Sequence, residues 1–138
     1  MNYSIKTYRC FDKGVKQLAK RYKSLKADLA SLAHELLQNP ESGTDLGGGL
    51  HKVRMSISAK GKGKRAGARV ITLIATISED EKEIGLHFIY DKSERENVTD
   101  KELQQILRIN GVIDCLTPLL QKGGGEFVPF KGRVVQCF

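Results

Sequence analysis

The apolar run at residues 70–77 restricts the fold of this chain more than any other segment. Its sequence, VITLIATI, contains six aliphatic side chains and two threonines. A strand with one solvent-facing side shows a polar residue at every second position, whereas this run is apolar on both sides. It therefore predicts a central β-strand that is covered on both faces.

The strand predicted before this run, at residues 50–58, has one polar face. Alternation puts His51 and Val53 on the buried side and Lys52 with Arg54 on the other side. We therefore expect a partly buried histidine at position 51 and two cations together on the open face of the sheet.

A third strand is predicted at residues 84–90, after a short polar turn. Alternation within it groups Leu86 with Phe88 and Tyr90, and puts His87 on the opposite side. Either face can belong to the core, which leaves open whether His87 lies near a functional site. Three strands joined in this order predict an antiparallel meander.

The chain before Pro40 is predicted to form a short strand and two antiparallel helices. The strand occupies residues 3–9, and a helical pattern follows Phe11 up to about Tyr22. Ser24 is a suitable N-cap for a second helix, which should end before Pro40. The apolar positions of this second helix have the spacing of one helical face: Leu25, Leu29, Leu32, Ala33, Leu36 and Leu37.

Two shorter segments complete the predicted elements. GTDLGGGL, at residues 43–50, is predicted as a turn and lacks the GxxxxGK[ST] pattern of a phosphate-binding loop. Thr99 and Glu102 have the spacing of a capping box for a short helix that ends near residue 110. The remaining residues, 111–138, form either a terminal element packed on the core or a poorly ordered tail.

Composition limits the class of protein. The 138 residues predict a single domain. The sequence shows no apolar run of membrane length and no signal-peptide core, so we expect a soluble cytoplasmic protein. The three cysteines are odd in number and widely spaced, which argues against a disulfide framework or a zinc site. We expect neither a metal nor a cofactor.

Positive charge is concentrated in parts of the chain. The net charge is +7, and residues 51–70 hold seven Lys and Arg residues and no acidic residue. Residues 13–26 form a second basic stretch, while residues 79–102 carry nine acidic and four basic side chains. This distribution suggests a polyanionic partner on one face. The alternative is a solvated surface that serves solubility.

Four features follow one another in the sequence. They are a basic helix pair, a Lys/Arg strand, the segment KGKGKRAGARVI at residues 60–71 and the segment IYDKSE at residues 89–94. In this order they resemble the RelE/HigB family of type II toxin–antitoxin toxins, in particular its HigB-like branch, over roughly residues 11–109. The resemblance implies an α+β fold with two N-terminal helices packed on a small antiparallel sheet. It implies a toxin domain at residues 1–110 and a C-terminal extension at residues 111–138.

The function implied by the resemblance is that of an endoribonuclease that cuts messenger RNA on the translating ribosome without a metal and so inhibits translation. A cognate antitoxin, expected to be of the helix-turn-helix type, silences such a toxin. Operator DNA is contacted only through the toxin–antitoxin complex, and no membrane is involved. Two alternatives are a non-catalytic translation inhibitor that binds RNA or the ribosome, and a degenerate toxin that acts only in transcriptional autoregulation.

The resemblance also implies roles for five residues at the cleavage site. Lys52 and Arg54 line this site on the open face of the sheet, and Arg69 binds the scissile phosphate. Lys92 corresponds to a basic residue near the leaving group. Tyr90 stacks on a base or takes part in proton transfer, and the second role requires neighbouring cations to lower its pKa.

Seven further cations are predicted to bind RNA, because phosphate contacts give affinity without sequence readout. The lysines between glycines are expected to be mobile electrostatic anchors and not catalysts. Asp91 and Glu94 are expected to form surface ion pairs with Lys92 and Arg95. The predicted RNA-binding residues are Lys60, Lys62, Lys64 and Arg65 in the loop, with Lys16, Lys20 and Lys23 in the first basic stretch.

Overall fold

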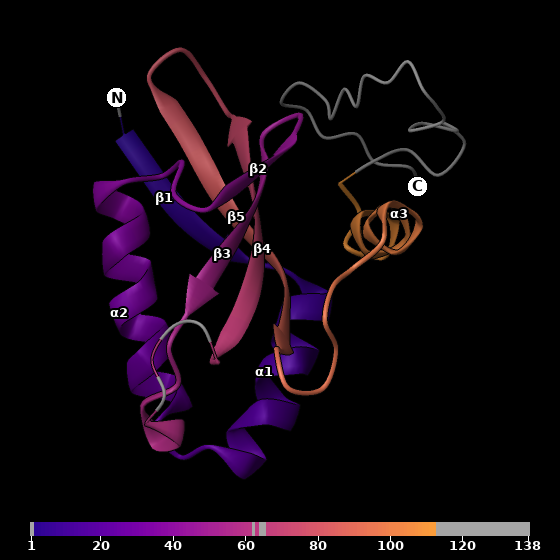
Figure 1. The fold of residues 1–138 in the computed structure, drawn as a ribbon. Coiled ribbons are helices and arrows are strands. Elements are labelled where there is room, and N and C mark those ends of the chain that lie inside the picture. The colour runs from indigo at the N-terminus through magenta and orange to yellow at the C-terminus, as the bar shows by residue number, and fades with distance from the viewer. Residues whose placement is uncertain (1, 62, 64–65, 113–138) are drawn as a thin grey trace.

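The computed structural model describes residues 2–61, 63 and 66–112, which form a β-sheet with helices on both faces (Figure 1). The strand order is β1-β5-β4-β3-β2, so β4 lies in the middle. The predicted α+β class with two N-terminal helices is confirmed. The strands are β1 (Asn2–Thr7), β2 (Thr44–Gly47), β3 (Leu50–Met55), β4 (Ala68–Thr76) and β5 (Glu81–Asp91), and the helices are α1 (Arg9–Arg21), α2 (Leu25–Gln38), a single 3-10 turn (Ser58–Lys60) and α3 (Asp100–Ile109).

The strands β3, β4 and β5 are antiparallel neighbours, as the predicted meander requires. The sheet as a whole is mixed, because β1 runs parallel to β5 along the other edge. After β1 the chain passes through α1 and α2, so no tight hairpin fixes the direction of β1 relative to its neighbour. The expectation of an entirely antiparallel sheet is therefore wrong at this strand.

The glycine-rich segment at residues 43–50 contains a strand as well as a turn. Thr44 pairs with Lys52 in an antiparallel hairpin between β2 and β3. Gly47 and Gly48 both have positive φ in the connection, a conformation that glycine adopts without steric cost. The sequence thus predicts the turn correctly but misses the edge strand before it, which is only four residues long.

Two apolar clusters lie on the two faces of the sheet. On one face, Leu18 of α1 and Leu36 of α2 belong to the same cluster as Val70 of β4. On the other face, Leu107 of α3 belongs to a cluster with Ile71. The prediction that the central strand is covered on both sides is confirmed. We expected the second face to be open, but α3 covers part of it.

A β-bulge at His87 changes which side chains of β5 share a face. Ile71 pairs with Phe88 and Thr72 pairs with Leu86, so His87 is an extra residue in the pairing. Leu86 consequently joins the cluster under α1 and α2, whereas Phe88 packs in the cluster under α3. The predicted grouping of Leu86 with Phe88 is wrong, because strict alternation does not allow for an inserted residue.

His87 is buried and connects the beginning of α1 to the end of α3. Its ring stacks on Tyr8 with 4.2 Å between the ring centroids. The Asn110 amide nitrogen donates to His87 Nδ1 at 2.9 Å, and its oxygen accepts from the Cys10 N–H, so the His87 proton lies on Nε2. Burial, with a smaller effect of Lys6, lowers the pKa of His87 to about 3. This residue is structural.

His87 should make the protein less stable in mild acid. The unfolded chain binds a proton at His87 below its ordinary pKa of about 6.5, while the folded protein does not until much lower pH. The free energy of unfolding should therefore fall as the pH drops below 6.5, by at most about 1.4 kcal/mol per pH unit. Chemical denaturation between pH 7 and pH 5 measures this slope, above the range in which carboxylates with lowered pKa values titrate.

Two histidine variants separate this effect from general acid sensitivity. His34→Gln, at an exposed position of α2, should keep the slope. His87→Phe retains a ring against Tyr8 but cannot titrate, so its stability should vary less with pH over the same range. An unchanged slope in His87→Phe would contradict the assignment.

Candidate functional site

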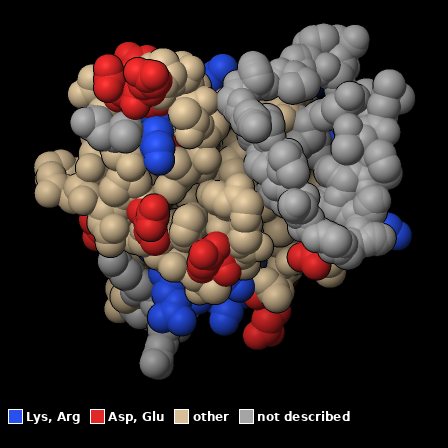
Figure 2. All heavy atoms as spheres, turned by 90° about the horizontal axis from the view of Figure 1, so that it is seen from above, with Lys and Arg blue, Asp and Glu red and all other residues tan. Residues whose placement is uncertain are grey.

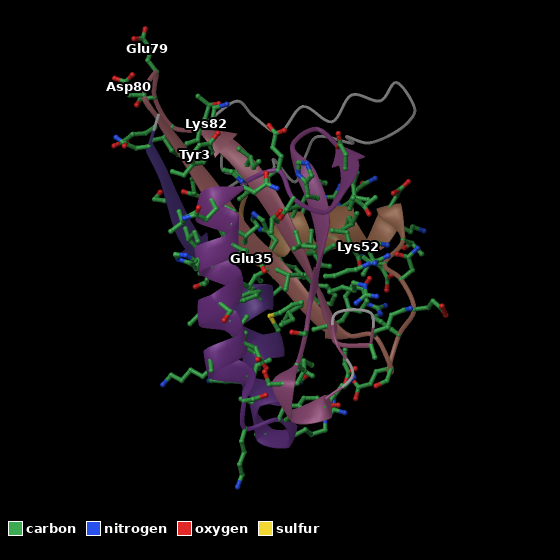
Figure 3. All side chains as sticks on the ribbon, turned by 60° about the vertical axis from the view of Figure 1, so that its left-hand side comes forward. Tyr3, Glu35, Lys52, Glu79, Asp80 and Lys82 are labelled. Carbon is green, nitrogen blue, oxygen red and sulfur yellow. The ribbon has the colours of Figure 1, made fainter. Side chains whose placement is uncertain are left out.

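Three of the predicted site residues lie opposite one another on neighbouring strands. Arg54 of β3 pairs with Arg69 of β4, and Arg69 pairs with Tyr90 of β5. We call Arg54, Arg69 and Tyr90 the cross-strand row. Tyr90 packs in the cluster on the α3 side of the sheet. Lys52 lies two residues before Arg54, on the side of the sheet that faces away from α2 (Figure 3).

The cross-strand row places two positive charges side by side. Arg69 is only 6% exposed. Burial and the neighbouring Arg54 lower its pKa, and Tyr90 acts in the opposite direction. Arginine nevertheless remains protonated at neutral pH. Like charges on directly opposed strand residues repel each other, and a pair of guanidinium groups favours an anion over a cation nearby.

The Tyr90 hydroxyl is buried and makes no hydrogen bond within the part of the chain that the structure describes. Burial raises its pKa, and the positive charges of Arg69 and Arg95 only partly oppose this rise. Tyr90 is therefore protonated at neutral pH, which suits it to donate a hydrogen bond. The lowered pKa that a general base would need is not found.

Arg95 is a neighbour of the row that the sequence did not reveal. Its guanidinium carbon lies 5.8 Å from the Tyr90 ring centroid and 5.9 Å from that of Phe88. It forms an ion pair with Glu102, whose carboxylate also caps α3 through Thr99. The predicted surface pairing of Arg95 with an acid in its own loop is wrong. Residues 92–98 show no periodicity, so only the capping box gave a signal that this loop is anchored.

Two contacts hold the loop after β5 beside the row. The Lys52 ammonium donates to Asn97 Oδ1 at 3.1 Å. The backbone N–H of Lys92 donates to the carbonyl oxygen of Gly67 at 3.0 Å, which continues the β4–β5 pairing past Tyr90. The backbone of Lys92 therefore lies next to the row, and the role of its side chain stays a prediction.

The predicted RNA-binding lysines fall in different parts of the molecule. Lys16, Lys20 and Lys23 are exposed, but α1 covers the face of the sheet opposite the row, so the structure does not bring them to the site. Lys60 was expected on a mobile arm, and this is wrong. Its side chain is only 13% exposed and is paired with Asp91. Their contacts with RNA stay predictions. Three members of the set, Lys62, Lys64 and Arg65, lie outside the described residues.

Asp91 is buried and not a surface partner of Lys92. Its side chain lies on the α1 side of β5, where it accepts hydrogen bonds from Lys60 and Tyr22. Glu94 pairs instead with Arg21 of α1. The expectation for Asp91 is wrong because a charged run such as DKSE reads as a solvated loop, while its first residue is the last residue of a buried strand.

Charge is separated along the strands. The turn between β4 and β5 carries Glu79 and Asp80, and β5 begins with Glu81; all three are exposed. They lie at the end of the sheet that Figure 2 views from above, and Figure 3 labels Glu79 and Asp80. The cross-strand row lies toward the other end, because Arg69 is near the start of β4 and Tyr90 near the end of β5. Such a charge separation favours approach of a polyanion at the row.

No helix among the described residues is long and apolar enough to cross a membrane. The same residues contain no group of three or more His, Cys, Asp or Glu side chains that could hold a metal ion. Cys10 is half-buried, while Cys115 and Cys137 lie outside the described part of the chain. The domain boundary after residue 110 and the extension that follows it stay predictions.

Comparison with known proteins gives the site a family context. A scan against protein families matches residues 8–119 to the RelE toxin of the RelE/RelB toxin–antitoxin system. No curated protein sequence matches the chain significantly. Toxins of the RelE family are generally ribonucleases, and they act with an antitoxin partner. Because the match covers most of the chain and the fold agrees with it, the chain belongs to the RelE family of toxins.

Proposed function

We propose that this toxin is an endoribonuclease that cuts messenger RNA on the translating ribosome and thereby inhibits translation. The observation that supports this most directly is the cross-strand row, in which Arg54 pairs with Arg69 and Arg69 pairs with Tyr90 on neighbouring strands. Guanidinium groups and hydroxyl hydrogen-bond donors are groups that bind phosphate oxygens, and the row brings two of the first kind and one of the second kind onto neighbouring strands. The family membership supports ribonuclease activity, and the RelE family supplies the expectation of an antitoxin partner.

The proposed reaction is attack by the ribose 2′-oxygen on the adjacent phosphorus. A new 2′-O–P bond forms, the P–O5′ bond breaks, a base accepts the 2′-hydroxyl proton, and the departing 5′-oxygen gains a proton. Arg69 and Arg54 stabilise the negative charge that develops on the phosphate oxygens. Tyr90 donates a hydrogen bond to the phosphate, and Lys92 is the candidate proton donor to the 5′-oxygen. Lys52 binds a neighbouring phosphate.

Primer extension on a reporter messenger RNA after brief induction of the toxin tests this function. New 5′ ends should appear within the translated region and should disappear when the start codon of the reporter is removed. Growth arrest without new ends would favour a translation inhibitor that does not cleave RNA. Absence of both effects would favour a degenerate toxin that serves only in autoregulation with its antitoxin, which we expect to be a helix-turn-helix protein that contacts the operator.

Removal of Arg54 should stabilise the free protein while weakening cleavage. Arg54→Gln removes one of two opposed charges from an exposed position, so the free energy of unfolding should rise by about 0.5 kcal/mol. Cleavage should fall at least roughly tenfold, because one charge that stabilises the transition state is lost. Urea denaturation and quantitative primer extension measure the two effects.

Lys26→Gln is a matched control for this variant. Lys26 is an exposed cation of α2, on the face of the sheet opposite the row. This variant should change neither stability nor cleavage appreciably. A less stable Arg54→Gln protein would show that the two arginines do not repel each other in the free state.

A further inference from the structure

The carboxylate of Asp91 is buried among charged and polar partners. It is 1% exposed, and its Oδ1 accepts from Lys60 Nζ at 2.6 Å and from the N–H and hydroxyl of Ser93 at 3.0 and 2.8 Å. Its Oδ2 accepts from the Tyr22 hydroxyl at 2.7 Å, and Arg21 contributes a second cation at 3.9 Å. Burial alone raises the Asp91 pKa, but these hydrogen bonds outweigh it and hold the pKa far below its usual range.

Lys60 connects four segments through one ammonium group. Besides Asp91, its Nζ donates to the carbonyl oxygen of Ala66 at 2.8 Å and lies 5.4 Å from the centroid of the Tyr22 ring. Lys60 and Ala66 flank residues 61–65, the central part of the basic loop. The ammonium therefore holds both ends of this loop against the end of β5 and against α1.

The Lys60–Asp91 ion pair lies on the opposite face of the sheet from the cross-strand row, at the same strand ends. Asp91 pairs with Ala68, and the next register pair is Tyr90 with Arg69. Successive side chains of a strand point to opposite faces, so Tyr90 faces the α3 side while Asp91 faces Tyr22, the residue that follows α1. The same two strand ends thus carry the row on one face and the ion pair on the other.

We propose that the Lys60–Asp91 pair is a positioning device for the cross-strand row, and that Lys60 acts on Asp91 and not on an RNA phosphate. Asp91 is then a positioning residue that acts through the backbone of Tyr90 and, through Lys60, on the start of β4. The inference rests on the proposed function, and it assigns Lys60 a different role from the other basic loop residues. Its energetic basis is that a buried pair is costly to break from one side only.

The test compares Asp91→Asn and Lys60→Gln with the wild-type protein in two assays. The first is single-turnover cleavage of messenger RNA on programmed ribosomes at saturating toxin. The second is binding of a fluorescent single-stranded oligoribonucleotide with 2′-O-methyl groups, which block cleavage, at several salt concentrations. Both variants should cleave roughly tenfold more slowly, because small displacements of catalytic groups have effects of this size or larger. Their salt dependence of binding should equal that of the wild type.

Three variants calibrate the result. Glu94→Gln removes an exposed carboxylate that also pairs with Arg21, and it should cleave within twofold of wild type. Lys60→Arg keeps a cation beside Asp91 and should recover part of the lost rate. Lys52→Gln removes a predicted phosphate contact, and it should reduce the slope of log affinity against log salt by about 0.7. If Lys60→Gln reduces this slope as Lys52→Gln does and keeps the wild-type rate at saturation, the proposal is wrong.

Amide hydrogen exchange tests the geometry without relying on cleavage. Asp91→Asn should speed exchange at the Lys92 N–H, which pairs with Gly67, while exchange in β1 stays unchanged. If Asp91→Asn does not fold, Tyr22→Phe, which removes one hydrogen bond to Asp91, should show the same local change more weakly. Wild-type protein that does not cleave would refute the proposed function alone, whereas unchanged exchange in the folded variant would refute the positioning device.

Discussion

Replacement of Arg69 with alanine is expected to reduce cleavage by about two to three orders of magnitude, the usual effect of removing one preorganised group that stabilises developing charge. Arg69 is the middle residue of the row, is almost fully buried and lies between Arg54 and Tyr90. Lysine at this position should recover little, because an ammonium group does not bind two phosphate oxygens in the planar arrangement of a guanidinium group. Single-turnover cleavage on programmed ribosomes measures the loss.

An exposed arginine outside the row provides the control. Arg9 is exposed at the start of α1, and Arg9→Ala should retain wild-type cleavage. Urea denaturation should show that the Arg69→Ala protein is folded in the absence of denaturant, since the substitution also removes the repulsion between the two arginines. If a folded Arg69→Ala protein cleaves at the wild-type rate, the scissile phosphate does not bind at the row.

Gly67→Ala is expected to cost roughly 3 kcal/mol of stability, in the range of severe overpacking. A β-carbon at Gly67 would lie 2.1 Å from the carbonyl oxygen of Met55 and 2.9 Å from the Cα of Ser56, so the backbone of β3 or β4 would have to move. Because Gly67 also accepts the hydrogen bond from the Lys92 N–H, this movement would displace both sides of the site. Urea denaturation and the cleavage assay should both detect the change.

Gly61→Ala separates this steric effect from the effect of glycine itself. Gly61 has a φ of 65° and no atom within 4 Å of its added β-carbon, so alanine there should cost only about 1 kcal/mol. Equal costs for the two variants would mean that the approach of Gly67 to Met55 does not control stability.

Local sequence patterns were sufficient for much of the fold. The alternation that puts Lys52 and Arg54 on one face depends only on strand geometry, and the structure shows both on β3 as expected. The run at residues 70–77 identified the central strand because a strand with apolar side chains on both faces is stable only when both faces are covered. The capping box of Thr99 and Glu102 is also present as predicted, because its hydrogen bonds connect neighbouring residues.

The parts that sequence did not predict depend on contacts between distant residues. No local sequence feature sets the direction of β1, and the alternation of β5 does not indicate the extra residue at His87. The site was affected in the same way: Lys60 and Asp91 look like solvated charges, but they meet across 31 positions in a buried pair. Charge composition predicts a basic surface without telling which cations face solvent.

The parallel pairing of β1 with β5 determines when the toxin is complete during its synthesis. Asn2 has its partner at Glu81, so β1 cannot pair until β5 has been made. Such distant pairings are slow to form, because the loop between them has to close first. A nascent chain that ends before Tyr90 also lacks the third residue of the row. The ribosome that makes this protein therefore meets the complete row only after β5 has been synthesised.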